Sequence, residues 1–387
     1  MKASKGSIEN LDTFKKRASF KSAYRILDVS LLIHSDDENI IFLFEQMYRR
    51  FKTDEKSVKN HFYVITKDSP FNQPFVIFCD EVRLIFGNEL MYNHAYMVIF
   101  NELKNLFEDF YIIHAGVVSL GEKGVVIVGP SSFGKTTLTL ELVSRGFKFL
   151  SDAFCPINWR TKKICSFPMS LSIREGSLNI LRNIPPKITT KKVDGNAKKK
   201  WFDIEDWKEG SIETCVDGKY FFFLKGKRSP YVKQGERIID LLLVKEDNQL
   251  IAELQELPET RLMSKQEAEY YTVYRFNFKQ GEGVSRRFEE VCEKHPQNIL
   301  YYEVVPIEEP HFDKEPSVEE IPKSRATLEL LKNLINRSQH AQILKDYKTS
   351  SLLLLNLGEV VSQVKCYDLF TGRLNQMAEL ITKTVEE

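Results

Sequence analysis

The chain has 387 residues, of which 42% are hydrophobic and 28% charged, and this composition predicts a globular protein of two or three domains. Its 55 basic and 54 acidic residues almost balance, which argues against general binding to nucleic acid or to a membrane surface. The opening residues lack the apolar core of a signal peptide, and no apolar run is long enough to span a bilayer. We therefore expect a cytoplasmic protein.

The first part of the chain predicts a β-rich domain, 23–110, after a polar and flexible start at residues 1–22. Short runs rich in Val, Ile, Phe and Tyr are separated by charged or turn-forming residues, and two helical patterns interrupt them. The expected strands are 24–34, 61–66, 74–80 and 82–87, and the expected helices are 39–51 and 90–110.

The next domain, 111–306, opens with two apolar strands joined by a very short turn. The strand at 110–120 and the fully apolar strand at 125–128 are separated only by Gly121–Gly124. Because a parallel crossover needs a dozen or more residues, these two strands must be antiparallel neighbours.

The residues after the second strand, GPSSFGKTT, match G-x-x-x-x-G-K-[ST], the loop that cradles the phosphates of a nucleotide. A helical pattern follows, so backbone N–H groups and the positive end of a helix dipole would face the phosphates. Lys135 can reach the β- and γ-phosphates, and Thr136 can ligate Mg²⁺. The predicted nucleotide site is Gly129, Pro130, Ser131, Ser132, Phe133, Gly134, Lys135, Thr136 and Thr137.

Two side chains outside the loop are further candidates. Asp152 ends the short apolar strand 147–152, where a carboxylate could bind Mg²⁺, accept the proton of a substrate hydroxyl or cap a turn. Asp247, next to Glu246, is a rival metal carboxylate. His114 lies on the strand paired with the loop strand, where it is either a core residue or a neighbour of the phosphates.

The remaining elements complete this domain and lead into a proline-rich acidic linker, 307–322, and a helical C-terminal extension, 323–387. Between 187 and 201 lies a lysine-rich stretch, and Lys191–Lys200 is interpreted either as a solvated loop or as a gate over the substrate. The six cysteines have no zinc-ligand spacing and predict reduced, mostly buried thiols. Further strands are expected at 219–224, 237–244 and 299–305, and helices at 135–146, 264–276, 281–295, 326–347, 351–367 and 373–387.

The run from Ile113 to Asp152 resembles the core of HPr kinase/phosphorylase-like proteins, whose nucleotide fold is shared with phosphoenolpyruvate carboxykinase. A weaker resemblance extends to about Val305. Ala153 departs from the family pattern, which often has a second aspartate there, and Thr137 stands where true HPr kinases carry a glutamate. The residues that match the pattern are His114, Gly121, Gly124, Gly129, Gly134, Lys135, Thr136, Arg145, Gly146 and Asp152.

The resemblance implies an α/β fold with α+β character, in which a phosphoenolpyruvate-carboxykinase-like P-loop core carries the β-rich N-terminal part and the helical extension. It also implies a divergent ATP-dependent kinase that uses ATP and Mg²⁺. The acceptor would be a serine-like hydroxyl of a precursor peptide, small protein or small molecule. In this interpretation Thr136 and Asp152 hold the metal, while Lys135, Asp152 and His114 act in catalysis.

Two other functions remain open at this point. Ala153 favours a non-catalytic nucleotide-binding module that presents a peptide or partner. A plain ATPase would need an arginine finger, for which Arg145, Arg160 and Arg174 are candidates. We expect no nucleic-acid or membrane partner, and self-association into a homo-oligomer is left open.

Overall fold

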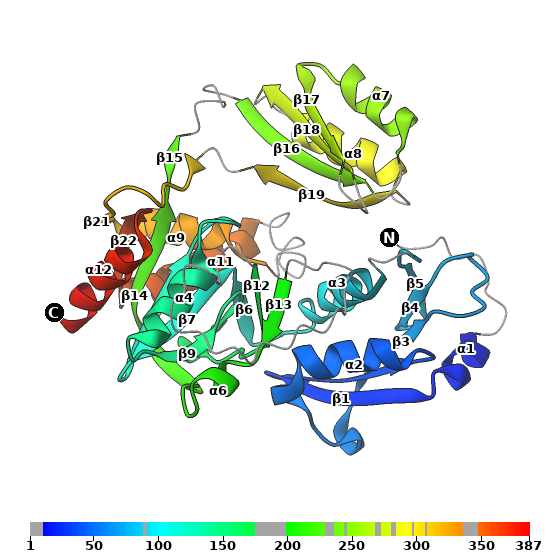
Figure 1. Ribbon diagram of the computed structural model, residues 1–387, viewed down its shortest axis with the longest axis horizontal. Helices are drawn as coiled ribbons and strands as arrows, with labels where there is room; N and C mark the ends of the chain where they lie inside the picture. The colour runs from blue at the N-terminus through cyan, green and yellow to red at the C-terminus, as the bar shows by residue number, and fades with distance from the viewer. Residues whose placement is uncertain are drawn as a thin grey trace. The chain divides into compact units, whose positions relative to one another are not determined.

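The computed structural model is a mixed α/β protein that forms two compact units (Figure 1). The smaller unit is Gly226–Glu309, and the larger one combines Lys2–Lys225 with Pro310–Glu387. The structure describes residues 11–87, 91–174, 199–228, 236–243, 246–267, 272–279, 284–295, 298–305, 308–335 and 347–387.

A five-stranded sheet in the order β1-β2-β3-β4-β5 forms the N-terminal part of the larger unit. Helix α2 covers one face, because Ile40 and Phe44 pack with alternate strand residues such as Leu31 and Phe62. The strands are β1 (Phe20–Ile26), β2 (Val29–Ser35), β3 (Asn60–Ile65), β4 (Phe75–Phe78) and β5 (Glu81–Leu84). The helices are α1 (Leu11–Arg17), α2 (Glu38–Met47), η1 (Arg49–Phe51), η2 (Glu55–Ser57) and α3 (Met91–Leu103).

The nine-stranded sheet of the larger unit carries the candidate site. Its main order is β6-β10-β11-β14-β8-β7-β9, and β22 pairs with both β14 and β21. The predicted hairpin is confirmed, since β7 is antiparallel to β8, while β14 is parallel to β8 on the other side. The strands are β6 (Phe110–Ile113), β7 (Ala115–Leu120), β8 (Lys123–Val128), β9 (Lys148–Ser151), β10 (Cys155–Asn158), β11 (Lys163–Cys165), β14 (Cys215–Lys225), β21 (Ser317–Glu320) and β22 (Lys365–Phe370).

Helices cover both faces of this sheet, which explains why β8 is apolar from Val125 to Val128. Val125 and Ile127 pack in the cluster that includes α4 and α12, while Val126 and Val128 pack in the cluster that includes α9 and α11. The helices are α4 (Lys135–Ser144), α6 (Ile204–Trp207), α9 (Lys323–Lys332), α11 (Tyr347–Ser362) and α12 (Leu374–Glu386), and a small separate sheet pairs β12 (Leu171–Arg174) with β13 (Lys199–Phe202).

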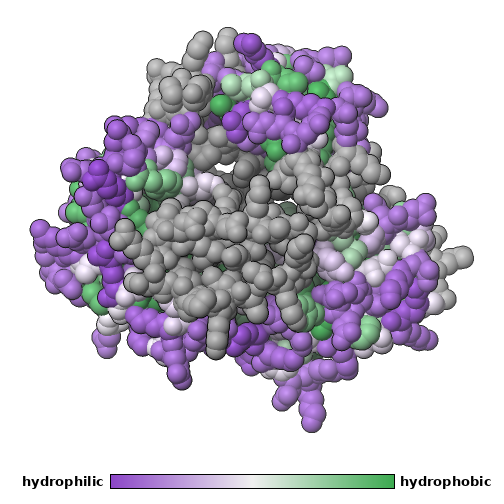
Figure 2. Space-filling view, in the orientation of Figure 1, coloured by the Kyte–Doolittle hydropathy of each residue, from purple (hydrophilic) through white to green (hydrophobic). Residues whose placement is uncertain are grey.

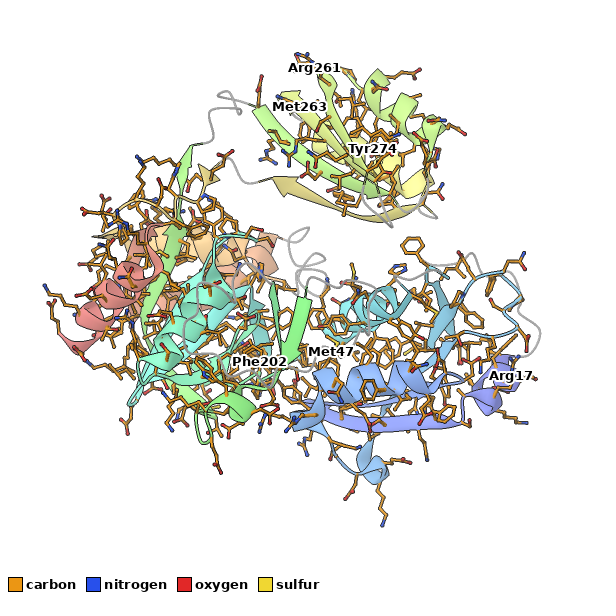
Figure 3. The ribbon with its side chains drawn as sticks, viewed as in Figure 1. Arg17, Met47, Phe202, Arg261, Met263 and Tyr274 are labelled. Atoms are coloured by element: carbon orange, nitrogen blue, oxygen red, sulfur yellow. The ribbon has the colours of Figure 1, made fainter. Side chains whose placement is uncertain are left out.

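The smaller unit has a four-stranded sheet in the order β17-β18-β16-β19 and a core of its own. In Figure 3, Tyr274 lies inside that core, whereas Met263 lies on the exposed strand β17. Its elements are β15 (Lys227–Arg228), β16 (Glu236–Leu243), α7 (Asn248–Glu256), β17 (Thr260–Glu267), β18 (Thr272–Lys279), α8 (Val284–Lys294), β19 (Ile299–Val305) and β20 (Glu308–Glu309).

Some predicted elements are wrong in type. The helix expected at 264–276 is part of strands β17 and β18, where Tyr274 and Phe276 are buried in the core with side chains of α7 and α8. The strand expected at 110–120 is divided at His114 into β6 and β7. The end of the helix expected at 351–367 belongs to β22, which takes a place in the central sheet. The domain boundaries given above stay a prediction.

Hydrophilic residues predominate over the described part of the surface in the view of Figure 2, and the cysteines are not joined in disulfides. None of the helices within the described ranges is long and apolar enough to cross a membrane. All six cysteines are free, as predicted, but only Cys155, Cys292 and Cys366 are buried.

Candidate nucleotide-binding site

The phosphate loop, Gly129–Thr137, connects the end of β8 to the start of α4. Gly134 has a φ of 80° and Ser132 a φ of 66°, so this loop uses the left-handed conformation at one glycine and at one serine. Phe133 explains the low glycine content of the loop, because its side chain is only 2% exposed and packs in the core between the sheet and α4. Ser131 and Ser132 are exposed.

Lys135 is folded back against the loop. Its Nζ donates hydrogen bonds to the carbonyl oxygens of Gly129 (2.8 Å) and Pro130 (2.9 Å). Burial lowers the pKa of Lys135 to about 8, and the charge of Asp152 opposes that shift. An ammonium group that is largely removed from water gains much from an anionic partner, which is what a phosphate would provide.

Asp152 follows β9 and lies beside the first turn of α4. The Thr136 hydroxyl donates a hydrogen bond of 3.0 Å to Oδ2 of Asp152. The other oxygen, Oδ1, is buried and has no hydrogen-bond partner among the described residues. Burial raises the pKa of Asp152 to about 6, against the Thr136 hydrogen bond and the charge of Lys135, which both lower it.

His114 lies between β6 and β7, and its backbone N–H donates to the carbonyl oxygen of Asn333 (2.8 Å). Burial lowers the pKa of its ring to about 4, with a further contribution from the charge of Lys135. His114 is therefore neutral at physiological pH. Its ring feels the charge of the loop lysine, and no hydrogen bond to the loop is present among the described contacts.

The sequence did not identify Phe312, which lies next to the phosphate loop. A methyl group on Gly134 would stand 3.2 Å from Cε1 of the Phe312 ring, and this ring is 47% exposed. The surrounding segment is anchored to the turn after β22, since His311 N–H donates to Oγ1 of Thr371 and Arg373 N–H donates to the carbonyl of Lys314. The sequence offered one indication of a role for Phe312, namely that it is an aromatic residue in the expected linker 307–322.

Asp247, Arg145 and Arg160, the other candidates from the sequence, form a helix cap and two ion pairs. Asp247 caps α7 by accepting a hydrogen bond from Leu250 N–H (2.9 Å), and it belongs to the smaller unit, whereas the phosphate loop belongs to the larger one. Arg145 pairs with Glu141, and Arg160 pairs with Asp109.

Two further candidates, Arg174 and the proposed gate, fall wholly or mostly outside the residues that the structure describes. The side chain of Arg174 lies outside the described residues. Most of the proposed gate, Lys191–Lys200, lies outside them too.

The residues around the loop fit a magnesium nucleotide. Buried Lys135, the carboxylate of Asp152 and the hydroxyl of Thr136 supply a cation, a carboxylate oxygen and a neutral oxygen. Mg²⁺ is commonly held by one or two carboxylates together with substrate phosphates, rather than by a cage of protein ligands. Within the described ranges there is no group of three or more His, Cys, Asp or Glu side chains placed to hold a metal.

Comparison with known proteins finds matches among solved structures. No protein-family model matches the chain. No curated protein matches it either. Among solved structures, it is similar to the HPr(Ser) kinase/phosphatase from Coxiella burnetii, with a TM-score of 0.20 and 13% sequence identity, over 48% of this chain and 90% of that chain.

Proposed function

We propose that the chain is an ATP-dependent kinase that transfers the γ-phosphoryl group to a serine-like hydroxyl of a peptide, a small protein or a small molecule. The observation that carries this proposal is the unpaired, buried Oδ1 of Asp152, held beside Thr136 and Lys135 at the start of α4. A loop that only holds a nucleotide does not need a second carboxylate oxygen kept free.

Each residue has a defined task in this proposal. The amides of the phosphate loop and Nζ of Lys135 bind and orient the phosphates. Thr136 and Asp152 hold Mg²⁺, which neutralises phosphate charge when bound. Asp152, with a pKa of about 6, is mostly ionised at neutral pH and accepts the proton of the acceptor hydroxyl at Oδ1. His114 stays neutral, and its ring feels the charge of Lys135.

Nucleotide binding is tested first, with calorimetry of Mg-ATP on the full chain. Lys135→Ala removes a charge-assisted contact worth about 1.5–3 kcal/mol, so affinity should fall at least about tenfold. Lys148→Ala, an exposed lysine on β9, is the control and should bind like the wild type. Equal affinity of the wild type and Lys135→Ala would exclude this loop as the nucleotide site.

Phosphoryl transfer is tested separately with a library of serine-containing peptides and mass spectrometry. The expected product is one phosphate heavier than the peptide, and Asp152→Asn should reduce its rate about 10²–10⁴-fold because the amide cannot accept the proton. Binding of Mg-ATP without any transfer would favour a non-catalytic nucleotide-binding module. Release of phosphate without transfer to the peptide would favour an ATPase.

A further inference from the structure

A pocket in the larger unit, away from the phosphate loop, is lined by four lysines and four other residues. It has a volume of about 410 Å³ and is lined by Lys123, Lys219, Tyr220, Lys323, Ser362, Gln363, Val364 and Lys365. This volume lies within the range of roughly 300–1,000 Å³ that is usual for small-molecule sites. The four ammonium groups reach the pocket from three strands of the central sheet and from α9.

These lysines are not neutralised by the protein. None of the four forms an ion pair with a carboxylate among the described residues, although Asp217 is the ladder partner of Lys123. Four positive charges close together repel one another, and this repulsion disfavours the pocket unless an anion is bound.

Several contacts hold the lysines in place. Nζ of Lys123 and Nζ of Lys365 lie 5.8 Å and 5.7 Å from the centre of the Tyr220 ring. Lys123 also donates to the carbonyl oxygen of Val385, and Lys323 donates to that of Val364. Lys123, Lys323 and Lys365 are therefore positioned by the fold before any ligand arrives, which reduces the entropy lost on binding.

The pocket and the phosphate loop lie at opposite ends of β8. β8, β14 and β22 are parallel. Lys123 and Lys365 begin β8 and β22, and Tyr220, in the middle of β14, is the ladder partner of Lys365. The phosphate loop follows the end of β8. Since a strand rises about 3.3 Å per residue, the two sites are roughly 17 Å apart along β8, too far for one compact anion to occupy both.

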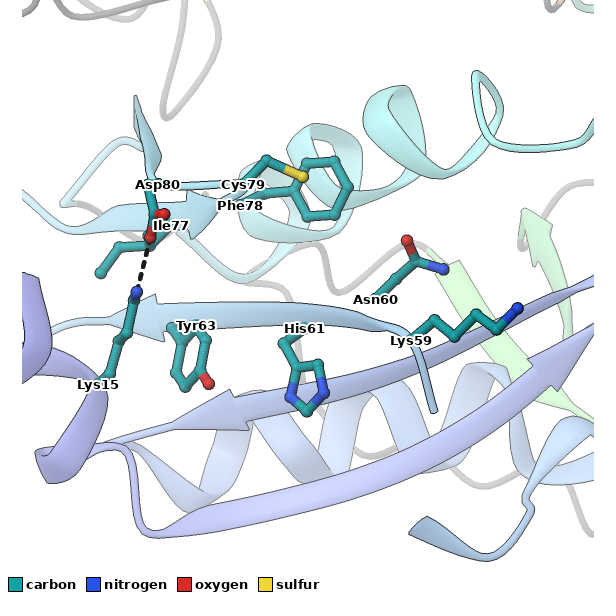
Figure 4. Close-up of a pocket in the computed structure, with 9 residues that line it drawn as sticks. All are labelled: Lys15, Lys59, Asn60, His61, Tyr63, Ile77, Phe78, Cys79 and Asp80. Carbon is teal, nitrogen blue, oxygen red and sulfur yellow. Dashed lines mark hydrogen bonds and ion pairs between the residues drawn. The ribbon is translucent and has the colours of Figure 1, made fainter. Parts of the chain in front are cut away.

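A comparison within the larger unit shows that clustered lysines are not always left unpaired. A smaller pocket on the N-terminal sheet, of about 230 Å³, contains Lys15 and Lys59 (Figure 4). There Lys15 pairs with Asp80 at 2.7 Å, so part of the charge is balanced by the protein itself. The lysine pocket at the other sheet has no such pair in the described residues.

We infer that this lysine pocket is a second anion site, separate from the phosphate loop, which binds a compact ligand carrying two or more phosphoryl groups. Lysine binds phosphate as a point charge, whereas planar carboxylates are usually recognised by the fork of an arginine, and no arginine lines this pocket. Four ammonium groups match the charge of a diphosphate better than that of a single phosphate.

The test uses inorganic pyrophosphate as the ligand and measures its binding by calorimetry at low salt. The parent protein is the full chain with Lys135→Ala, in which anion binding at the phosphate loop is weakened. Replacing both Lys219 and Lys365 with glutamine in this chain should weaken binding by about tenfold or more, because two charge-assisted contacts are lost. Lys219→Arg with Lys365→Arg keeps both charges and should retain most of the affinity.

Thermal unfolding shows whether the chain with Lys219→Gln and Lys365→Gln is folded. The glutamine pair removes repulsion, so without pyrophosphate its thermal midpoint should equal or exceed that of the parent chain. The rise in midpoint that pyrophosphate causes in the parent should be lost. Lys16→Gln with Lys67→Gln, two exposed lysines of the N-terminal part, controls for net charge and should keep the rise. Pyrophosphate binding that is absent after Lys135→Ala alone, or unchanged by the glutamine pair, would overturn the inference.

Discussion

At the scale of single residues, the burial of Asp152 makes the stability of the larger unit depend on pH. Its pKa is raised from 3.8 to about 6, so the folded chain holds this proton over a pH range in which the unfolded chain has released it. Stability that comes from this group is therefore complete at low pH and is lost as pH rises from about 4 to above 6.

Asp152→Asn removes that dependence while keeping the shape of the side chain. We expect the thermal midpoint of the variant, relative to the wild type, to increase between about pH 4 and pH 7 in the absence of nucleotide. Differential scanning calorimetry across this range measures the effect. Asp54→Asn, at an exposed aspartate, should show no such trend, and a constant difference between Asp152→Asn and the wild type would contradict the assigned burial.

Phe312 offers an exposed aromatic surface next to the loop, and we expect it to stack on the base of the nucleotide. Stacking of this kind is worth about 1–3 kcal/mol, so Phe312→Ala should weaken ATP binding about 5- to 150-fold. Inorganic tripolyphosphate has no base, and its affinity should not change. Calorimetry with both ligands separates the two effects, and Phe20→Ala, at another exposed phenylalanine, is the control. Equal losses for ATP and tripolyphosphate would show that the ring acts on the loop and not on the base.

At the scale of elements, Asp203 ties the N-terminal part of the larger unit to α6. It is only 3% exposed, accepts three hydrogen bonds from the guanidinium of Arg50, and caps α6 by accepting a hydrogen bond from Glu205 N–H (2.9 Å). Removing its charge leaves Arg50 without its partner and weakens the cap.

Asp203→Asn should therefore lower the free energy of unfolding in urea by about 1–3 kcal/mol. Asp206 provides an exposed comparison. It pairs with Arg49, which also lies 3.4 Å from Asp203, and the side chains of Asp206 and Arg49 are 52% and 50% exposed. Asp206→Asn should cost about 0–1 kcal/mol. Similar losses for both variants would mean that the Asp203 pair contributes no more than a surface ion pair.

At the scale of the whole molecule, the smaller unit is an insertion, and the chain segments on both sides of it are hydrogen-bonded to Thr371. Thr371 N–H donates to the carbonyl oxygen of Lys225 (2.8 Å), and Thr371 Oγ1 accepts from His311 N–H (2.9 Å). Every hydrophobic cluster among the described residues takes its members from only one of the two units.

Replacing 226–309 with a flexible linker of about six residues should therefore leave the larger unit folded. Circular dichroism and a cooperative thermal transition would show this, and Mg-ATP affinity measured by calorimetry should stay within about threefold of the full chain. The same linker inserted after Lys225 with 226–309 retained controls for the linker itself. Loss of the cooperative transition in the shortened chain alone would show that the larger unit requires the inserted one.

The sequence by itself was sufficient for the phosphate loop, its preceding strand and its following helix. These features depend on contacts between near neighbours: glycine at the positive φ of Gly134, a helix that starts at Lys135, and a turn between Gly121 and Gly124 too short for a parallel connection. Thr136 and Asp152, which the resemblance pairs at a metal, are joined by a hydrogen bond, and the roles assigned to them stay predictions.

Tertiary structure decided the features that join residues far apart in the chain. Phe312 reaches Gly134 only because its segment is anchored to the turn after β22, and the lysine pocket gathers charges from strands that are distant in sequence. The stretch 264–276 has helix-forming residues such as Lys265 and Glu267, yet its described residues lie in strands, because the sheet buries Tyr274 and Phe276 against α7 and α8. Burial of large apolar side chains contributes more free energy than local helix propensity, and only the folded chain determines which side chains are buried.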